Sequence, residues 1–437
     1  LDSLSSASRK DVTSSFSTFL NQAGVPVVSV ALDCTGKTPT LHLEQQRFLP
    51  LGSKGSVNQS WKLPVCIRYD GGGAGECTLM SDRRMDVALQ KAHGCPAWVQ
   101  ANNQAKGYYR VDYKDGLLSA LSSGKGAAQL GAAERDDLLG NAQAMSNAGK
   151  LPVADALALV ETFHNDSERA VVERAITVAL TPSMDLVPEE LMPNYQRFLL
   201  KNFQARAHEL GWLPHPGESD DVRLLRPTLL SAVAMEGGDR ELANQARELA
   251  DRWLKDPASV DPEVARAILN TAAYYGDVAM FNRMLAAYQK SRDRREKRQI
   301  VNAMRYLRDP RAIEAALQSV LSGAIPILDG YIFLVNAGQG WPATRHMAFE
   351  FIKAHFDQIT RDRPSIFGFD LGAFLPRAGQ SFCDEKSRNE LQAFFGPIVD
   401  RYSGAPRNLA QVVEAIDLCI AKKAAQSAGV AAFLRKY

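Results

Sequence analysis

The chain has 437 residues, with 51 basic and 49 acidic side chains, and 46% of its residues are hydrophobic. A chain of this length and composition folds into about two or three globular domains and is neither collagen-like nor disordered. The net charge of +2 indicates no partner among nucleic acids or anionic lipids. No segment approaches the roughly 18 consecutive apolar residues of a membrane-spanning helix, so we expect none in this chain.

The first 22 residues predict a helix. Asp11 can cap a helix that includes Phe16 and Leu20, and Gly24 with Pro26 ends it. The chain begins with neither an initiator methionine nor the charged and apolar pattern of a signal sequence. We therefore expect this end to be a cut edge of a longer protein.

Residues 23–114 have a β-type pattern of short runs separated by turn formers. The runs are Val27–Leu32, Thr40–Phe48, Trp61–Tyr69, Glu76–Met80 and Tyr108–Tyr113. Apolar and polar residues alternate strictly in Leu41–Gln45, which is typical of a strand with one buried and one solvated face. This stretch predicts a small β-sandwich domain.

From residue 115 to residue 437 the pattern becomes helical. Phe281, Met284, Leu285 and Tyr288 recur with the i, i+3, i+4, i+7 spacing of one apolar helix face. Gly, Pro and Asp-Pro separate such segments, for example Asp309-Pro310. So many helices with short loops do not fit one bundle, so we expect a large α-superhelical domain of the HEAT/armadillo type.

The six cysteines leave two readings open. None shows the Cys-x-x-Cys spacing of a zinc knuckle, and buried free thiols are one reading. In the other, Cys77 and Cys95 lie in neighbouring strands and form a disulfide. A disulfide would place the protein in an exported or periplasmic setting and free thiols in the cytoplasm, so the sequence leaves the localisation undetermined.

None of the seven histidines forms a zinc-binding helix, which needs two histidines four residues apart with a glutamate after the first. The nearest arrangement is His208-Glu209 with His215. Gly211 and Pro214 intervene, so one continuous helix cannot present both rings on one face. We predict no metal site and no catalytic residue in this chain.

Several short segments form a further pattern because of their order along the chain. They are Phe19–Val30, Leu43–Phe48, Trp61–Val65, Trp98–Tyr113, Glu134–Ala142, Leu210–Trp212, Ala348–Ile352 and Arg407–Ile416. In this order they resemble the C-terminal half of the M1 family of zinc aminopeptidases, which includes aminopeptidase N and the endoplasmic reticulum aminopeptidases. Each segment alone is weak evidence for this family, and the resemblance rests on their occurrence in the family's order along the chain.

The resemblance implies that the full-length protein is a hydrolase that removes N-terminal residues from peptides by zinc-activated water. The family's zinc helix, its Gly-x-Met-Glu-Asn segment and its transition-state tyrosine have no counterpart in this sequence. Residues 1–22 then resemble the tail of an absent catalytic domain, and the chain alone would be inactive and bind no zinc. Its expected partners are peptide substrates and the protein's own upstream catalytic domain.

The resemblance also suggests substrate contacts. In the endoplasmic reticulum branch, the stretch that corresponds to Arg361–Asp384 lines the peptide chamber and meets the far end of the peptide. This stretch holds Arg363, Arg377 and Gln380. We predict Arg377 and Gln380 as contacts, with Arg345 as a further candidate, because a guanidinium group can pair bidentately with a carboxylate. The alternatives are solvated surface residues and, for the whole chain, an α-solenoid scaffold that binds peptides or proteins without a catalytic role.

Overall fold

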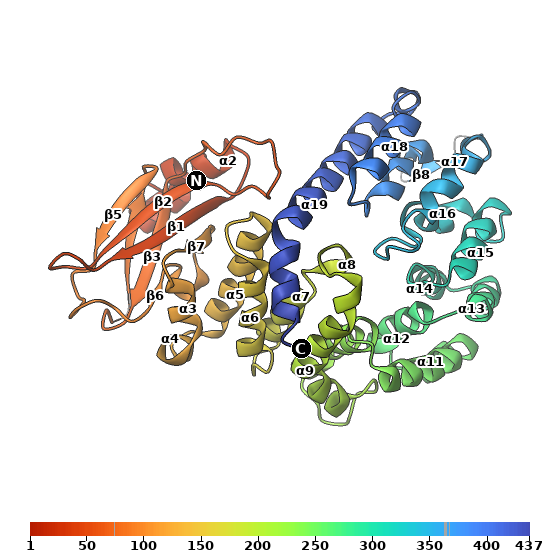
Figure 1. Cartoon of the computed structure of the whole chain (residues 1–437), viewed down its shortest axis with the longest axis horizontal. Helices are drawn as coiled ribbons and strands as arrows, with labels where there is room; N and C mark the ends of the chain where they lie inside the picture. Colours follow the sequence, from red (N-terminus) through yellow and green to blue (C-terminus); the bar gives the residue numbers. More distant parts are fainter. Residues whose placement is uncertain (74, 362–364, 367) are drawn as a thin grey trace. The chain divides into compact units, whose positions relative to one another are not determined.

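The computed structural model describes residues 1–73, 75–361, 365–366 and 368–437 (Figure 1). The chain divides into two compact units, Leu1–Thr181 and Pro182–Tyr437. Sheets in the first unit precede a long series of helices, which confirms the predicted β-then-α architecture. The predicted boundary between residues 114 and 115 follows the last strand of these sheets, and as a domain boundary it stays a prediction.

Two short helices open the first unit, α1 (Asp2–Ser8) and α2 (Val12–Leu20). Asp11 caps α2, because its carboxylate accepts a hydrogen bond from the backbone N–H of Ser14 at 3.0 Å. Phe16 and Leu20 of α2 remain exposed, at 48% and 68% of their surface. The predicted cap is therefore present, and part of the apolar face of α2 is uncovered.

Seven strands form two sheets. The first has the order β5 (Arg84–Ala88), β2 (Thr40–Arg47), β1 (Pro26–Asp33), β7 (Arg110–Tyr113), and the second has the order β4 (Glu76–Met80), β3 (Leu63–Tyr69), β6 (Val99–Gln100). Strands β1 and β7 are parallel, and the other neighbours are antiparallel. Leu41 and Leu43 of β2 are buried, as the alternating pattern predicts, and they share a core with Trp61 of the segment before β3.

All six cysteines are paired, so the expectation of free thiols is wrong. The disulfides are Cys34–Cys95, Cys66–Cys77 and Cys383–Cys419. The predicted Cys77–Cys95 bond is wrong as well. The antiparallel register of β3 and β4 places Cys77 opposite Cys66, with their Cα atoms 4.0 Å apart, so Cys77 bonds across this strand pair.

The helices of the first unit are α3 (Leu117–Ser122), α4 (Gly124–Ala128), α5 (Ala132–Asn147), α6 (Val153–Phe163) and α7 (Arg169–Ala179), with a 3-10 turn η1 (Asn103–Ala105) before β7. Helix α5 packs against β7, α6 and α7. Glu134 in its first turn is buried and pairs with Arg68 of β3, with Oε2 and Nη2 2.6 Å apart. This ion pair attaches α5 to the second sheet.

The helices of the second unit are α8 (Ser183–Leu186), α9 (Met192–Leu210), α10 (Asp220–Ser231), α11 (Arg240–Lys255), α12 (Pro262–Tyr274), α13 (Val278–Lys290), α14 (Arg294–Met304), α15 (Pro310–Leu321), α16 (Ile327–Asn336), α17 (Met347–Thr360), α18 (Glu385–Phe395) and α19 (Ala405–Leu434). Shorter elements are η2 (Glu189–Leu191), η3 (Ala232–Glu236), η4 (Pro257–Ser259), η5 (Leu371–Ala373), η6 (Leu375–Gly379), η7 (Val399–Arg401) and the strand pair β8 (Ser365–Ile366) and β9 (Phe369–Asp370). None of the described helices combines the length and the hydropathy of a membrane-spanning segment.

These helices stack in two rows. Helices α10, α12, α14 and α16 contact one another in the first row, and α11, α13, α15 and α17 do so in the second. The Asp-Pro pairs explain where the helices begin. Asp261 and Asp309 accept hydrogen bonds from backbone N–H groups of the first turns of α12 and α15, and Pro262 and Pro310 occupy positions whose N–H needs no partner.

Helix α19 packs against both ends of the helical series. It contacts α18 and η6 near the end of the chain and α8 and α9 near the start of the unit. The Asn194 side chain of α9 donates a hydrogen bond to the Leu434 carbonyl at 3.0 Å, and the rings of Phe198 and Phe433 lie 5.4 Å apart. In Figure 1 helices α9 to α18 follow an arc, and α19 runs back from α18 toward α9.

Candidate functional site

A cavity of about 350 Å³ lies at the carboxyl-terminal ends of the first row of helices. We call it the helix-end pocket; its lining includes Glu236, Tyr274, Arg305, Arg308, Gln339 and Trp341. These residues end η3 and α12 or follow α14 and α16. The last carbonyl groups of a helix carry partial negative charge, so this edge of the row favours cationic side chains.

Arg308 is held in this pocket mainly by aromatic rings. Its guanidinium carbon lies 3.3 Å from the ring centre of Tyr274 and 3.8 Å from that of Trp341. Glu236 lies at 3.9 Å, and burial raises the pKa of this carboxyl and lowers the pKa of Arg308. Cation–π stacking on two sides therefore fixes Arg308 as part of the pocket wall.

Arg305 lies one turn before Arg308 and is exposed. Its side chain forms no hydrogen bond and no ion pair with any residue that the structure describes. A guanidinium group offers five N–H donors in a planar fork. Arg305 thus presents an unpaired cation to a ligand in the helix-end pocket.

The opposite wall of the pocket is a tight loop between α16 and α17. Gly338 has φ +73°, and a side chain there would lie 2.4 Å from the Thr344 carbonyl oxygen. The Thr344 hydroxyl donates a hydrogen bond back to the Gly338 carbonyl at 3.0 Å. Glycine is therefore required at residue 338 for this loop to close and shape the wall.

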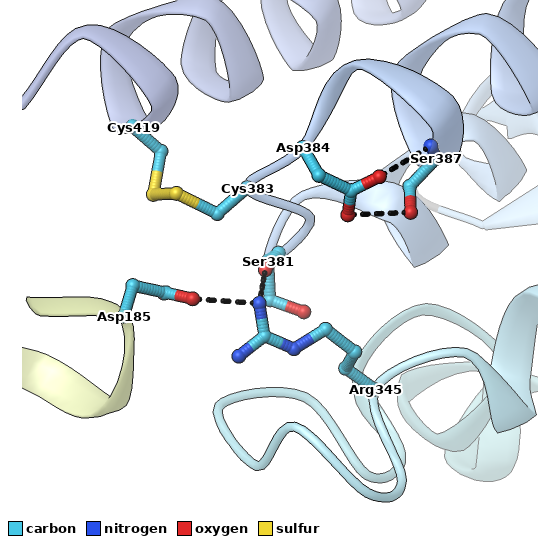
Figure 2. Close-up of a disulfide and its surroundings, with 7 residues drawn as sticks. All are labelled: Asp185, Arg345, Ser381, Cys383, Asp384, Ser387 and Cys419. Atoms are coloured by element: carbon cyan, nitrogen blue, oxygen red, sulfur yellow. Dashed lines mark hydrogen bonds and ion pairs between the residues drawn. A yellow bond between two sulfur atoms is a disulfide. The ribbon is translucent and has the colours of Figure 1, made fainter. Parts of the chain in front are cut away.

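A second cluster adjoins this loop, and we call it the Arg345 junction; it comprises Asp185, Arg345, Ser381 and the disulfide Cys383–Cys419 (Figure 2). Nη1 of Arg345 donates to Asp185 Oδ1 at 2.7 Å and to the Ser381 carbonyl at 3.1 Å. Arg345 is only 7% exposed. The junction thereby joins α8, the loop before α17, the segment before α18 and α19.

Comparison with known proteins identifies the family. A family model described as ERAP1-like C-terminal domain matches residues 98–418. The chain belongs to the ERAP1-like C-terminal domain family. The helix-end pocket and all of the Arg345 junction except Cys419 lie within the residues that this ERAP1-like match covers. The predicted resemblance to the C-terminal part of M1 aminopeptidases is confirmed.

Several curated relatives have aminopeptidase in their names. Aminopeptidase M1 of Arabidopsis thaliana is 26% identical over 412 residues, which cover 90% of this chain and 45% of that protein. The puromycin-sensitive aminopeptidase of Caenorhabditis elegans is 23% identical over 432 residues, 95% of this chain and 44% of that protein. The mouse glutamyl aminopeptidase is 27% identical over 432 residues, with 95% and 44% covered. The ERAP1-like chain spans less than half the length of each of these relatives.

The described lining of the helix-end pocket does not include Arg345, Arg377 or Gln380, although it includes Thr344 and Ser381 beside them in the chain. Arg377 on η6 and Gln380, which follows it, are both exposed. The Gln339 side chain, which lines the pocket, donates a hydrogen bond to the Arg377 carbonyl at 2.9 Å. Arg345 is buried in the junction, and Arg363 lies outside the described residues. The roles of Arg377, Gln380 and Arg345 in substrate binding stay predictions.

The described residues of the ERAP1-like chain offer no set of free donor groups that fits zinc. In the described ranges, Asp185, Cys383 and Cys419 form the one cluster of three potential ligands. Its two sulfur atoms are bonded to each other, and Asp185 is paired with Arg345. His208 is likewise engaged, because its Nε2 lies 2.7 Å from Asp239 Oδ2 at the start of α11. No step that uses zinc can be assigned to these residues.

Sequence reasoning missed Arg305 and Arg308 as functional residues. The lining of the pocket comes from several helix ends that are distant in the chain, and the spacing between these ends carries no local motif. One signal was present, because two arginines three residues apart precede the start of a helix at Asp309-Pro310. Arginines in such a position extend over the last carbonyl groups of the preceding helix.

Proposed function

We propose that this chain is the non-catalytic C-terminal part of a zinc aminopeptidase that removes N-terminal residues from peptides. In this proposal the helical unit shapes the chamber that encloses the peptide and contacts the end of the peptide that is not cleaved. Membership of the ERAP1-like family and the aminopeptidase names of the relatives support it. The zinc and the catalytic residues would belong to the part of the enzyme outside this chain.

The unpaired Arg305 in the helix-end pocket is the observation that carries the substrate contact. A peptide that enters with its N-terminus at a catalytic site presents its C-terminal carboxylate at the other end. A guanidinium group binds a carboxylate through two parallel N–H···O bonds, which are about twice as strong as neutral hydrogen bonds. The Trp341 ring, stacked on Arg308, offers a rigid apolar surface for the last side chain.

Arg377 and Gln380 would extend this contact at the rim of the pocket. Both side chains are exposed, and Gln339 connects the backbone of Arg377 to the pocket lining. Among the described residues, the Arg377 guanidinium makes one polar contact, a long one of 3.5 Å to Asn408 Oδ1. Little rearrangement is therefore needed for Arg377 to turn toward a peptide.

Peptide binding to the chain tests this proposal. A ten-residue peptide with an N-terminal fluorophore is titrated by fluorescence polarisation, once with a free C-terminal carboxylate and once as the C-terminal amide. We expect the amide to bind at least about tenfold more weakly, because it leaves the Arg305 cation unpaired. Equal affinities for the two peptides would contradict the carboxylate contact.

Variants then localise the contact. Arg305→Gln should remove most of the difference between the two peptides, and Arg377→Gln should reduce it in part. Arg311→Gln is the matched control, because Arg311 follows the same turn but its side chain is 82% exposed outside the pocket. If Arg311→Gln has the same effect as Arg305→Gln, general surface charge and not the pocket binds the peptide.

The assignment of a non-catalytic role has its own test. The purified chain should bind no stoichiometric zinc and release no fluorophore from aminoacyl-coumarin substrates. Chelator-sensitive hydrolysis by this chain would contradict it. In the full-length enzyme, Arg377→Ala should slow the cleavage of long peptides more than that of single-residue substrates.

A further inference from the structure

The first unit contains a cavity of about 510 Å³ that the proposed function does not use. We call it the Gly140 pocket; its polar lining includes Arg110, Asp137 and Arg174, and its apolar lining includes Phe48 and Tyr108. Strand β7 contributes Arg110, helix α5 contributes Asp137 and helix α7 contributes Arg174. Three packed elements therefore hold these charged groups around one cavity.

The guanidinium groups of Arg110 and Arg174 both lie close to Gly140 of helix α5. A methyl group built on Gly140 would lie 3.4 Å from Nη1 of Arg110 and 3.7 Å from Nε of Arg174. Because Gly140 has no side chain, both arginines can approach helix α5 closely and point into the same space. Two cations so close together repel each other unless an anion lies between or beside them.

The two arginines differ in their partners. Arg174 is oriented by Asp136, with 2.9 Å from its Nε to Oδ1 and 3.4 Å from its Nη2 to Oδ2. The Arg110 side chain makes no hydrogen bond or ion pair with any part of the chain that the structure describes. Arg174 is thus held in place by its own carboxylate, while the donors of Arg110 are available.

Asp137 supplies the opposite charge in the same cavity. Its Oδ2 accepts hydrogen bonds from the side-chain amides of Asn102 at 3.3 Å and Asn141 at 3.0 Å. Burial raises the pKa of Asp137 to about 6, and the two asparagine hydrogen bonds and the positive charge of Arg110 limit this rise. Near pH 7.5 the carboxylate is ionised, and its Oδ1 has no hydrogen-bond donor among the described residues.

A pocket that holds two guanidinium groups beside an ionised carboxylate favours a ligand that carries both a negative and a positive charge. The charges of Arg110 and Arg174 balance those of Asp136 and Asp137, so the pocket is neutral near pH 7.5. A simple anion would be repelled by Asp137, and a simple cation by Arg110. A zwitterion adds no net charge and can pair with both groups at once.

We propose that the Gly140 pocket binds a free α-amino acid with an apolar side chain. Arg110 and Arg174 bind its carboxylate, and Oδ1 of Asp137 accepts a hydrogen bond from its ammonium group. Phe48 contacts its side chain. This binding site lies in the first unit and is independent of peptide binding in the second unit.

Equilibrium dialysis of the 437-residue chain against radiolabelled L-leucine at pH 7.5 tests the site. We expect saturable binding with one site per chain and a dissociation constant between about 10 μM and about 1 mM, which is usual for so small a ligand. Leucinamide lacks the carboxylate and N-acetyl-leucine lacks the ammonium group. Each should compete at least about tenfold more weakly than leucine, because one charged group of the pocket stays unpaired.

Two variants locate the ligand. Arg110→Met and Asp137→Asn should each weaken leucine binding at least about tenfold. Arg84→Met is the matched control, since Arg84 lies on the edge strand β5 with its side chain 79% exposed, and it should leave the affinity unchanged. Thermal unfolding of each variant checks folding, and Asp137→Asn is expected to unfold at no lower temperature than the unmodified chain.

Three results would overturn the proposal. The first is no saturable binding of leucine up to about 10 mM, well above the expected range. The second is competition by leucinamide or N-acetyl-leucine as strong as that by leucine, which would remove the need for both charges. The third is unchanged leucine affinity in the folded Arg110→Met and Asp137→Asn variants, which would place the ligand elsewhere.

Discussion

The Arg345 junction and the helix-end pocket adjoin the same loop, yet they hold their arginines differently. Arg345 is 7% exposed and bonds Asp185 and Ser381. Arg305 is exposed and bonds no described residue. Burial commits the first cation to the stability of the fold, whereas the second is available to a ligand. Arginine can therefore be part of the fold at one residue and remain available to a ligand at another nearby, and only its surroundings distinguish the two cases.

Arg345→Ala should have the largest effect on stability. The substitution leaves the Asp185 carboxylate without its buried cation and the Ser381 carbonyl without a donor. Loss of one partner from a buried ion pair costs about 3–5 kcal/mol. Urea unfolding monitored by circular dichroism measures the loss. A decrease below about 1 kcal/mol, as for surface ion pairs, would remove the distinction between the junction and the pocket.

The disulfide in the junction should come next. Replacement of both Cys383 and Cys419 by serine opens a loop with a sequence separation of 36 residues, and the expected loss is about 3–4 kcal/mol. The pair Cys66 and Cys77, with a separation of 11, is the control and should cost about 1 kcal/mol less. Equal losses would contradict a dependence on loop length. Because disulfides persist in oxidising compartments, we expect the protein to fold in one.

The Gly140 pocket adds a third case to this comparison, because the ionised form of Asp137 lowers the free energy of unfolding. Its pKa rises from 3.8 to about 6 on folding, so the folded chain binds more protons than the unfolded chain between these values. The free energy of unfolding therefore falls as the pH rises through this range and stays lower above pH 6. Asp137→Asn removes this cost and should stabilise the chain by about 1–2 kcal/mol more at pH 7.5 than at pH 4.5.

Urea unfolding of the unmodified chain and Asp137→Asn at both pH values measures this difference. Other carboxyl groups titrate in the same range, but they are present in both chains and cancel. Asp155→Asn serves as the control, since Asp155 lies on α6 outside the pocket. A pH-independent difference between the unmodified chain and Asp137→Asn would show that burial does not perturb this carboxyl.

Arg305→Ala should have the smallest effect on stability. The side chain is exposed and has no described partner, so the free energy of unfolding should change by less than about 0.5 kcal/mol. Urea unfolding of Arg305→Ala and Arg345→Ala under the same conditions compares the contributions of the two arginines to the free energy of unfolding directly. A loss above about 1 kcal/mol would show that Arg305 is structural after all.

The sequence predicted the fold well where local chemistry decides it. The alternation of Leu41 and Leu43 with polar neighbours gave a strand with a buried face, and Asp309 before Pro310 marked a helix start. The cysteine pairing was not predicted, because it depends on the register of β3 and β4, which places Cys77 opposite Cys66. The predicted Cys77–Cys95 bond was wrong for this reason, and the expectation of free thiols was wrong because all six cysteines are paired.

The sites were harder to predict than the fold. The helix-end pocket gathers Tyr274, Arg308 and Trp341 from three helix ends, and nothing in their spacing shows that these ends converge. The Gly140 pocket has the same difficulty, since Arg110 and Arg174 lie on different elements. Tertiary convergence of residues distant in the chain leaves no short motif, so only the three-dimensional structure reveals it.

Helix α19 has a consequence for the mechanics of the second unit. An open stack of helix pairs behaves as a spring, because each repeat contacts only its neighbours and small rotations add along the stack. Here 30 helical residues, about 45 Å at 1.5 Å per residue, connect both ends of the series. Because α19 has a fixed length and packs against both ends of the helix series, it restricts the motion in which these ends move apart or together. Insertion of one residue in α19 would lengthen the helix by about 1.5 Å and turn one end by about 100°, so the unit should tolerate length changes in its loops far better than in this helix.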